Sequence, residues 1–453
     1  MDNSMQCTSS DVIQENRDYT MFSWSVQSSS NPMHITRGQG VWFWDGEGNK
    51  WLDFSSQVIN LNIGHQHPKV LEAIKKQVDE LCFAGPGFAT EPRGMLGKKL
   101  AEVTGLAKAF YTLGGAEANE NAMKIARLYT GREKIISRYR SYHGATMGAM
   151  TASGDPRRWP VEPGIPGILR VFDPYCYRCP FGKTPDSCRR ECVSHIEEVI
   201  QMEGPHTIAA ILVEGITGSN GILVPPDDYF PKLRALCDKY GILLIDDEVM
   251  SGFGRTGTWL ATQHYGIKPD IVTCAKGLTS GYMPLGAVVV SKDIAAYFET
   301  HMLWGGLTYS GHPVCCAAAV ANLAVYEEED IFADVERQGA YLAERLEQMK
   351  RDFACVGDVR YKGLFSVVEL VRDKATKEPL APFNGTSPEM GLLAGHLKSK
   401  HIYAFTRFNM LWICPPLIIT KEELKQGLDA IEKALAVVDG ALHPVEEVSY
   451  VSR

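Results

Sequence analysis

Two stretches of the sequence decide the fold: GILLIDDEVMSGFGRTG (241–257) and DIVTCAKGLTSGYMPLG (270–286). Each begins with a short, continuous run of apolar residues, and each run stops at an ionisable side chain. The first run ends at Asp246 and Asp247, and the second ends at Lys276. Runs of this length and composition are typical of strands that are buried on both faces of a parallel sheet.

A third run of the same kind, IAAILV (208–213), ends at Glu214. The interval from Glu214 to Asp247 is 33 residues and that from Asp247 to Lys276 is 29, about one strand–helix–strand unit of roughly 30 residues each. Because parallel strands point the same way, all three runs deliver a charged side chain to the carboxyl edge of one sheet, where open α/β folds bind ligands. A lone lysine after a strand is usually a surface residue, but three converging charges favour a functional site.

The segment between the first two of these strands in chain order has the features of a helix. Asp227 and Asp228 are suitable N-caps, and Gly241 is a suitable stop. Strands and helices alternate in this way from residue 66 to 330, which predicts an α/β fold: a large domain with a mostly parallel sheet flanked by helices. The apolar face of the predicted helix consists of Leu233, Leu236, Cys237 and Tyr240.

Both ends of the chain differ from this central part. Residues 1–65 are expected to form an N-terminal arm that is polar and irregular to about residue 36. Two short strands in GVWFWDGEGNKWLDF (40–54) follow and contribute to a small domain. The stretches 332–353 and 421–439 have the charged amphipathic pattern of long helices. We therefore expect a smaller α+β domain over residues 331–453.

Composition excludes several classes of protein. The chain has 453 residues, 45% of them hydrophobic and 22% charged, which is typical of a globular protein and of neither a disordered nor a collagen-like one. The formal net charge of −8, with no block of basic residues, argues against nucleic-acid binding. Without an apolar run long enough for a membrane span, or the layout of a signal or transit peptide, a cytoplasmic protein is expected.

A possible phosphate-binding turn precedes the predicted sheet strands just described. The stretch KAFYTL (108–113) is predicted to be a strand, and Gly114, Gly115 and Ala116 follow it before a helical pattern over 117–131. Small residues at a helix N-terminus let backbone N–H groups approach an anion, whose charge the helix dipole favours. On its own the pattern is weak, because two glycines before a helix are more often a simple chain reversal.

Taken together, the sequence resembles the class III (ω-type) aminotransferases, which are fold-type I pyridoxal-phosphate enzymes. The resemblance rests first on Lys276 within TCAKGLTSGYMPLG, with DDEVMSGFGRTG before it and GGLTYSGHP after it. It extends over nearly the whole chain, which makes coincidence implausible. The further matching segments are NIGHQHPKV (62–70), GGAEANENAMKIAR (114–127), SYHGAT (141–146), VEGITGSNG (213–221) and CPPLIIT (414–420).

The resemblance implies a role for each charged residue at the sheet edge. Lys276 would hold the cofactor aldehyde as a Schiff base and, once released by the substrate amine, would act as the acid and base that moves a proton. Asp247 would keep the pyridine nitrogen protonated, which makes the ring an electron sink. Either aspartate could instead be a helix cap or turn residue; the family pattern selects Asp247 and leaves Asp246 in that structural role.

Further cofactor contacts are implied by the same resemblance. Tyr142 would stack on one face of the cofactor ring and Val249 would pack on the other, although either could be an ordinary core residue. Gly115 and Ala116 correspond to the phosphate turn. The family commonly carries serine on both sides of the glycine, where this chain has Gly114 and Ala116. This departure leaves the phosphate to backbone N–H groups.

Substrate and partner residues are implied in turn. Arg407 matches a mobile arginine that grips a substrate carboxylate, against the alternative of a solvated surface arginine. Trp24 and Phe88 stand where these enzymes wall the substrate pocket, although aromatic residues are more often core. Glu214 would hold neighbours of the cofactor. Thr308 matches a threonine that reaches the phosphate of a neighbouring subunit, which implies a homodimer or tetramer with shared active sites.

Four cysteines stand outside this account: Cys176, Cys179, Cys188 and Cys192. Their CxxC and CxxxC pairs have a possible zinc spacing, with a short gap between the pairs, and the site would be structural. Disulfides or free thiols are the alternatives.

The sequence thus predicts an enzyme that transfers an amino group from an ω-amino acid or primary amine to a keto acid, with pyruvate expected, through pyridoxal phosphate. Within the family, the segments SWSVQ, EGITGSNG and TRFNMLW resemble the taurine or β-alanine:pyruvate branch most closely. An aminomutase or decarboxylase of the same fold is the nearest alternative, and a non-catalytic protein organised by a metal is a remote one.

Overall fold

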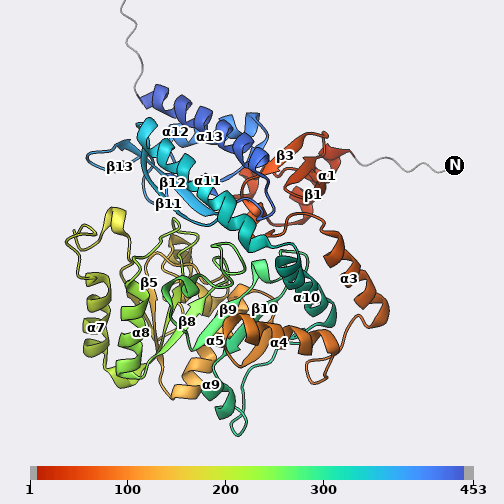
Figure 1. Cartoon of the computed structure of the whole chain (residues 1–453), viewed down its shortest axis with the longest axis vertical. Helices are drawn as coiled ribbons and strands as arrows, with labels where there is room; N and C mark the ends of the chain where they lie inside the picture. Colours follow the sequence, from red (N-terminus) through yellow and green to blue (C-terminus); the bar gives the residue numbers. More distant parts are fainter. Residues whose placement is uncertain (1–7, 443–453) are drawn as a thin grey trace, which may run out of the picture.

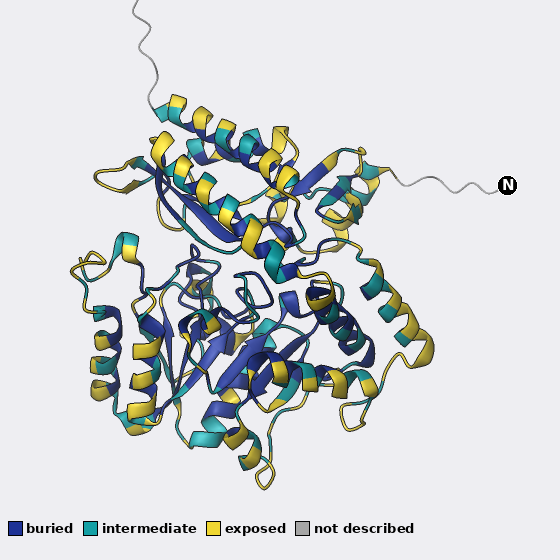
Figure 2. Ribbon diagram, in the orientation of Figure 1, coloured by how far each residue is buried: buried dark blue, intermediate teal, exposed yellow. Residues whose placement is uncertain are grey.

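A computed structural model describes residues 8–442 of the chain. Figure 1 shows a lower body built around a central sheet, with helices on both of its faces, and an upper body in which the C-terminal helices lie beside the N-terminal strands. The inner strands of the central sheet are buried almost throughout, whereas the outer helices expose one face each (Figure 2). The candidate site depends mainly on the central sheet.

This sheet has seven strands, and six of them are parallel to one another. The exception, β10, is antiparallel to both of its neighbours. The expected mostly parallel sheet is therefore confirmed. In sheet order the strands are β4 (Lys108–Thr112), β10 (Gly286–Val290), β9 (Ile271–Cys274), β8 (Leu243–Asp247), β7 (Ile208–Glu214), β5 (Lys134–Arg138) and β6 (Ile168–Val171).

Alternating side chains of this sheet pack against different helices. In β7, Ile211 belongs to the cluster under helices α7 and α8, whereas its neighbour Leu212 belongs to the cluster under α5. This period of two explains why the strand sequences are apolar without interruption: both faces are covered. Helices of this body are α3 (Pro68–Glu80), α4 (Glu91–Thr104), α5 (Gly115–Thr130), α6 (Met147–Ala152), α7 (Glu191–Glu203), α8 (Tyr229–Tyr240), α9 (Lys292–Tyr297) and α10 (Pro313–Glu328).

Helix α8 has the predicted extent, but the capping hydrogen bond expected at its start is absent. The helix ends at Gly241, whose φ of 60° is the left-handed conformation that favours glycine. Asp228 stands at the N-cap, yet its carboxylate makes no capping hydrogen bond. It pairs instead with Arg190 and with Lys232, one turn into the helix. The Asp228 carboxylate thus forms ion pairs with two cations instead of accepting from the N–H groups at the helix start.

The upper body contains two further sheets. Strands β1 (Ile35–Gln39), β2 (Trp42–Asp45) and β3 (Lys50–Asp53) form one with β14 (Ile402–Tyr403), which pairs in parallel with β3. The second has the order β11 (Val356–Lys362), β12 (Phe365–Asp373), β16 (Met410–Ile413) and β15 (Phe405–Arg407), with β13 (Glu378–Pro379) paired to β12. The division of the chain at residues 65 and 330 stays a prediction.

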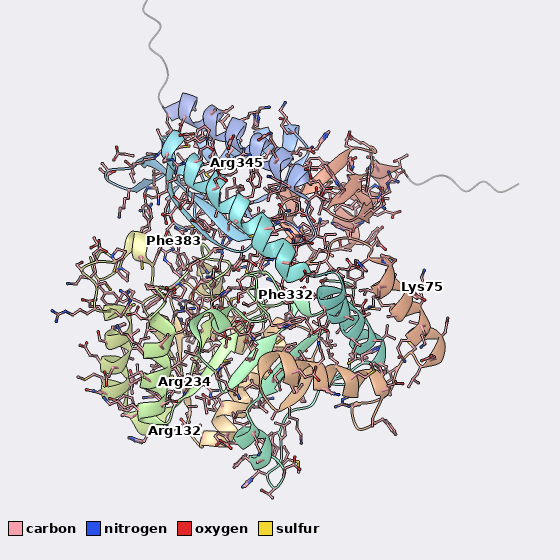
Figure 3. The ribbon with its side chains drawn as sticks, in the orientation of Figure 1. Lys75, Arg132, Arg234, Phe332, Arg345 and Phe383 are labelled. Carbon is pink, nitrogen blue, oxygen red and sulfur yellow. The ribbon has the colours of Figure 1, made fainter. Side chains whose placement is uncertain are left out.

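Two long helices complete this body, and a charged group joins them. Arg345 of α11 (Ile331–Asp352), labelled in Figure 3, donates to Asp429 at 2.9 Å and to Glu432 at 2.7 Å, both on α13 (Lys421–Leu442). Helices α2 (Ser56–Ile59) and α12 (Pro388–Ser399) also belong to this body.

Among residues 8–442, no helix is long and apolar enough to cross a membrane.

The N-terminal arm is more regular than expected. Ser9–Tyr19 form helix α1, where the polar composition had predicted irregular structure. Thr8 explains the difference: its hydroxyl accepts from the backbone N–H of Asp11 at 3.2 Å, and the Asp11 carboxylate accepts from the backbone N–H of Thr8 at 2.9 Å. This reciprocal cap satisfies two helix-end donors that would otherwise lack partners.

Candidate active site

A cavity of about 570 Å³ opens at the carboxyl edge of the central sheet. The register of the strands brings the charged residues there: Glu214 of β7 is paired with Asp247 of β8, and Asp247 with Thr273 of β9, three residues before Lys276. The predicted convergence of three charges is therefore confirmed. Seven of the residues proposed from the sequence line this cavity: Gly115, Ala116, Tyr142, Glu214, Asp247, Val249 and Lys276.

Asp247 is buried and held by three donors. Its Oδ2 accepts from Asn119 Nδ2 and from His143 Nδ1, each at 2.7 Å, and its Oδ1 accepts from the Val249 backbone N–H at 3.0 Å. Thr273 in turn donates to the Asn119 amide oxygen at 2.8 Å, which fixes the orientation of that amide. The carboxylate can therefore hold one position while it faces the cavity.

Lys276 begins a tight turn directly after β9, with a φ of 43° in the left-handed region. A non-glycine residue in this conformation is uncommon and marks a site where the surrounding structure imposes the backbone. Its ammonium group makes no hydrogen bond or ion pair with any residue in the described range 8–442. Burial lowers the pKa of Lys276 to about 8, although Asp247 and Glu214 act in the opposite direction.

Glu214 ties two loops of the site together. Its Oε1 accepts from the Tyr142 backbone N–H at 3.1 Å, and its Oε2 accepts from the Gly218 backbone N–H at 2.7 Å. Burial raises the pKa of Glu214 to about 6. The side chain thus links the loops that follow β5 and β7.

The start of α5 is packed so closely that only glycine fits at Gly115, where a Cβ would lie 2.7 Å from Val249 Cγ1. The loop after β5 packs equally closely against this turn, since a Cβ on Gly144 would lie 2.4 Å from the Cβ of Ala116. A Cβ on Gly114, by contrast, would meet nothing within 4 Å. Gly114, Gly115 and Ala116 also line the cavity, so the first turn of α5 borders open space, as an anion-binding helix end requires.

Two arginines share one buried aspartate at the edge of this cavity. Asp155 accepts from Arg157 Nε at 2.8 Å and from Arg407 Nη1 at 2.7 Å. Burial alone raises the pKa of Asp155, but these hydrogen bonds outweigh it and lower the pKa to about 2. The Arg157 guanidinium lies 3.5 Å from the centre of the Tyr142 ring, and the Trp24 ring packs edge-on against Tyr142 at 6.1 Å.

Comparison with known proteins decides between the possible uses of such a site. The family model "Aminotransferase class-III" matches residues 24–435 of this chain. The chain belongs to the class III aminotransferases. It is accordingly a pyridoxal-phosphate-dependent aminotransferase, and the predicted family, activity and cofactor are confirmed.

Individual relatives cover this aminotransferase almost completely. A leucine/methionine racemase from Thermococcus litoralis is 39% identical over 418 residues, 90% of this chain and 91% of its own. The taurine–pyruvate aminotransferase of Bilophila wadsworthia is 35% identical, over 95% of this chain and 98% of its own. Among solved structures, the taurine:2-oxoglutarate aminotransferase of Bifidobacterium kashiwanohense, in complex with PLP and glutamate, has a TM-score of 0.93 at 43% identity, with 96% and 99% covered.

The cavity of this aminotransferase fits pyridoxal phosphate. An anchored carboxylate, Asp247, suits a protonated ring nitrogen, and an unpaired amine, Lys276, suits the aldehyde. Beside Gly114 there is open space at the helix N-terminus for a phosphate group, with Val249 and Tyr142 on the cavity wall to contact a planar ring.

Some proposed residues lie elsewhere in this single chain. Thr308 is exposed and does not line the cavity, and Phe88 lines a separate hollow of about 550 Å³. Trp24 and Arg407 are at the cavity edge through their contacts with Tyr142 and Ser219. No sequence signal had been recognised for Asn119 and His143, which hold Asp247, or for Asp155 and Arg157, which form a cluster with Arg407. His143 follows Tyr142 within the SYHGAT segment, which was a usable signal; Asp155 carried none.

The four-cysteine segment lies outside the cavity. Cys176, Cys179, Cys188 and Cys192 are all free thiols. Over residues 8–442, no group of three or more histidine, cysteine, aspartate or glutamate side chains is arranged to hold a metal ion. Cys188 Sγ instead donates to the Glu191 carboxylate at 3.2 Å.

Proposed function

We propose that this aminotransferase acts on donors and acceptors that carry an acidic group, with an ω-amino acid of the taurine or β-alanine type as donor and a keto acid, pyruvate first, as acceptor. The observation that carries this proposal is the pair of arginines, Arg157 and Arg407, on one aspartate at the cavity edge. Two guanidinium groups and one carboxylate leave one positive charge in excess. Forked guanidinium donors bind carboxylate and sulfonate oxygens well.

Relatives with related activities support a keto-acid acceptor, and two of the three also support an acidic amine donor. Those that resemble the chain over most of its length include a taurine–pyruvate aminotransferase, a putrescine–pyruvate aminotransferase and a taurine:2-oxoglutarate aminotransferase. The putrescine enzyme acts on a donor without an acid group. An arginine that can leave Asp155 and return to it accommodates both kinds of substrate.

When bound, pyridoxal phosphate supplies an electron sink for the carbon that loses its proton. The residues of this chain prepare that step. Lys276 Nζ moves the proton, and its lowered pKa means that an appreciable fraction of the amine is neutral near pH 8. Asp247, fixed by Asn119 and His143, holds a proton on the group that it faces. Tyr142 and Val249 line the cavity and would limit the access of water to a bound ring.

The proposal includes a homodimer or a larger assembly with shared sites. Phe88, Trp304 and Tyr309 are 71%, 68% and 52% exposed, and Thr308 lies between the last two. Exposed aromatic residues of this size favour a protein–protein contact. Such a contact would bring Thr308 of one subunit to the cavity of the other. Light scattering across a dilution series measures the assembly, and a monomer with full activity would contradict it.

An absorption experiment tests the donor and the role of the lysine. The holoenzyme is expected to show the yellow band of the lysine-bound cofactor, and Lys276→Ala is expected to lack it. Taurine, β-alanine, 4-aminobutyrate, L-alanine and an aromatic amine are then added singly without acceptor. Bleaching by an acidic ω-amine supports the proposal. Bleaching by the aromatic amine alone would contradict it.

A matched pair of variants tests the arginine. Arg407→Ala should raise the KM for pyruvate by roughly 10- to 100-fold, the loss expected of a charged hydrogen bond, and change the KM for a neutral amine much less. Arg407→Lys retains the charge without the fork and should fall between them. Equal losses for both substrates would overturn the role of Arg407.

The racemase relative gives a second candidate reaction, racemisation of an amino acid. Loss of optical activity of L-leucine without any keto acid would favour it.

A further inference from the structure

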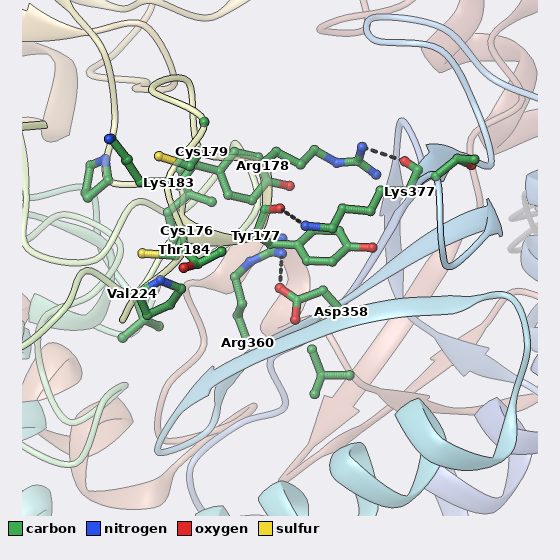
Figure 4. Close-up of a pocket in the computed structure, with 17 residues that line it drawn as sticks. Cys176, Tyr177, Arg178, Cys179, Lys183, Thr184, Val224, Asp358, Arg360 and Lys377 are labelled. Atoms are coloured by element: carbon green, nitrogen blue, oxygen red, sulfur yellow. Dashed lines mark hydrogen bonds and ion pairs between the residues drawn. The ribbon is translucent and has the colours of Figure 1, made fainter. Parts of the chain in front are cut away.

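A second cavity, larger than the first at about 800 Å³, lies away from the cofactor cavity. One wall is the loop 174–185, which contains Cys176 and Cys179, and the opposite wall is formed by β11 and the turn before β13. Figure 4 shows Arg178 and Lys377 reaching across from opposite walls, each donating to a backbone carbonyl of the other wall, with Lys183 at the outer rim. Its volume is within the range of about 300–1,000 Å³ that is usual for sites of small organic ligands.

The lining of this cavity is predominantly cationic. Four positive side chains, Arg178, Lys183, Arg360 and Lys377, face one negative side chain, Asp358. They come from segments almost 200 residues apart, so local sequence does not explain their convergence. In a cavity with low-dielectric walls such an excess of one sign concentrates the field and attracts counter-charged ligands.

Internal ion pairs neutralise only part of this charge. Glu369, behind the wall, pairs with Arg178 and with Arg360, and Asp358 also pairs with Arg360 at 2.8 Å. Lys377 has no carboxylate partner within the described part of the chain; its Nζ donates to a backbone carbonyl, that of Tyr177, at 2.9 Å. In addition, Nη2 of Arg178 is buried without a hydrogen-bond acceptor. At Lys183 the nearest carboxylate oxygen, on Glu191, is 3.8 Å away.

We propose that this cavity binds a small organic dianion, such as a dicarboxylate or a phosphate ester, between Lys183 of one wall and Lys377 of the other. A ligand with two charges compensates both lysines at once, which a monovalent ion does not. The tyrosine rings of the same lining, Tyr175 and Tyr177, already contact cations and offer apolar faces to the carbon skeleton. Nothing in the proposed aminotransferase reaction requires this second site.

One loop contributes to both cavities, since Ser219 lines the cofactor cavity and Leu223 and Val224 line the second. Arg360 Nε donates to the Gly221 carbonyl at 2.8 Å. The same loop carries Gly218, which Glu214 holds. Binding in the second cavity therefore acts on a loop that also positions the active site, and we expect occupancy to change the KM for the keto acid.

Calorimetry on the holoenzyme tests the site, with succinate, AMP and inorganic phosphate as probes at constant ionic strength. The expected result is saturable binding of one succinate or AMP per chain, tighter than that of phosphate. Lys183→Gln and Lys377→Gln should each weaken it by about fivefold, the effect of one partly screened ion pair. Lys374→Gln is the matched control, because Lys374 Nζ also donates to a backbone carbonyl but does not line the cavity.

The proposal would be overturned by the absence of saturable binding by succinate and AMP, by wild-type affinity in the Lys183→Gln/Lys377→Gln double variant, or by phosphate binding as tight as that of the organic dianions. Binding that disappears in Arg407→Ala would also overturn it, since the ligand would then be in the cofactor cavity. None of these results depends on which amine the enzyme uses.

Discussion

Replacing Gly115 by alanine tests whether the cofactor cradle is close-packed. The added Cβ would lie 2.7 Å from Val249 Cγ1 and 2.9 Å from Cγ2, well inside contact distance. Valine is stiff about χ1, so it cannot turn both methyl groups away. Overpacking of this kind costs about 1–3 kcal/mol. If that cost appears in cofactor binding, the Kd for pyridoxal phosphate rises by roughly 5- to 150-fold.

The assay is a spectral titration of cofactor-free protein with pyridoxal phosphate. Gly114→Ala is the control, because its Cβ meets nothing within 4 Å and its φ of −174° is extended. Val249→Ala removes both clashing methyl groups, so the double variant Gly115→Ala/Val249→Ala should recover most of the loss. We expect a coupling of about 1–2 kcal/mol between the two sites, as for residues in direct contact.

Two results would refute the reasoning. If Gly115→Ala binds the cofactor like the wild type, the turn has room that the structure does not show. If Gly115→Ala is impaired but Val249→Ala does not restore it, the clash with Val249 is not the cause. Equal impairment in Gly114→Ala would mean that any side chain in this turn disturbs the phosphate site.

Three further predictions concern charged groups. Asp155→Asn removes the negative charge that partly neutralises Arg157 and Arg407. Steady-state kinetics should therefore show a KM for pyruvate about fivefold lower, with the KM for a neutral amine unchanged. A higher KM for pyruvate would contradict this. Glu214 has a pKa raised to about 6, so cofactor retention after gel filtration should fall from pH 7 to 5, and Glu214→Gln should remove this pH dependence. Folding lowers the pKa of Lys276 from 10.5 to about 8. Between pH 8 and 10.5 the folded protein therefore binds fewer protons at Lys276 than the unfolded chain does. The free energy of unfolding, and with it the Tm of the cofactor-free protein, should rise with pH over this range. Lys276→Met should lack this rise, and Asp247→Asn should begin it at lower pH, because the Asp247 charge raises the pKa of the lysine.

The large domain was the most predictable part of the fold. Strands buried on both faces have uninterrupted apolar sequences, and β7, β8 and β9 were found where those sequences lie. The direction of β10 was not predictable from its composition, since Gly286–Val290 is as apolar as a parallel strand. Helix α1 was missed because its stability depends on a cap at Thr8 rather than on an apolar face.

The site was predictable where a residue's chemistry depends on its own segment. Lys276 and Asp247 follow strands, so their place at the sheet edge could be deduced from the sequence. The contact between Asp155 and Arg407 joins residues 252 positions apart and depends on how the two bodies pack. Asn119 likewise reaches Asp247 across 128 positions. A single sequence contains no local pattern for either pair.

Strand β3 pairs with β2 on one side, but its partner on the other side comes much later in synthesis, because Leu52 pairs with Ile402 about 350 residues further on. At roughly 5–20 residues per second the ribosome needs on the order of 20–70 s to deliver that partner. Throughout this time one edge of the N-terminal sheet has unpaired backbone groups, which are a template for association with other chains. The need for protection of the nascent chain therefore follows from the strand order rather than from any one residue.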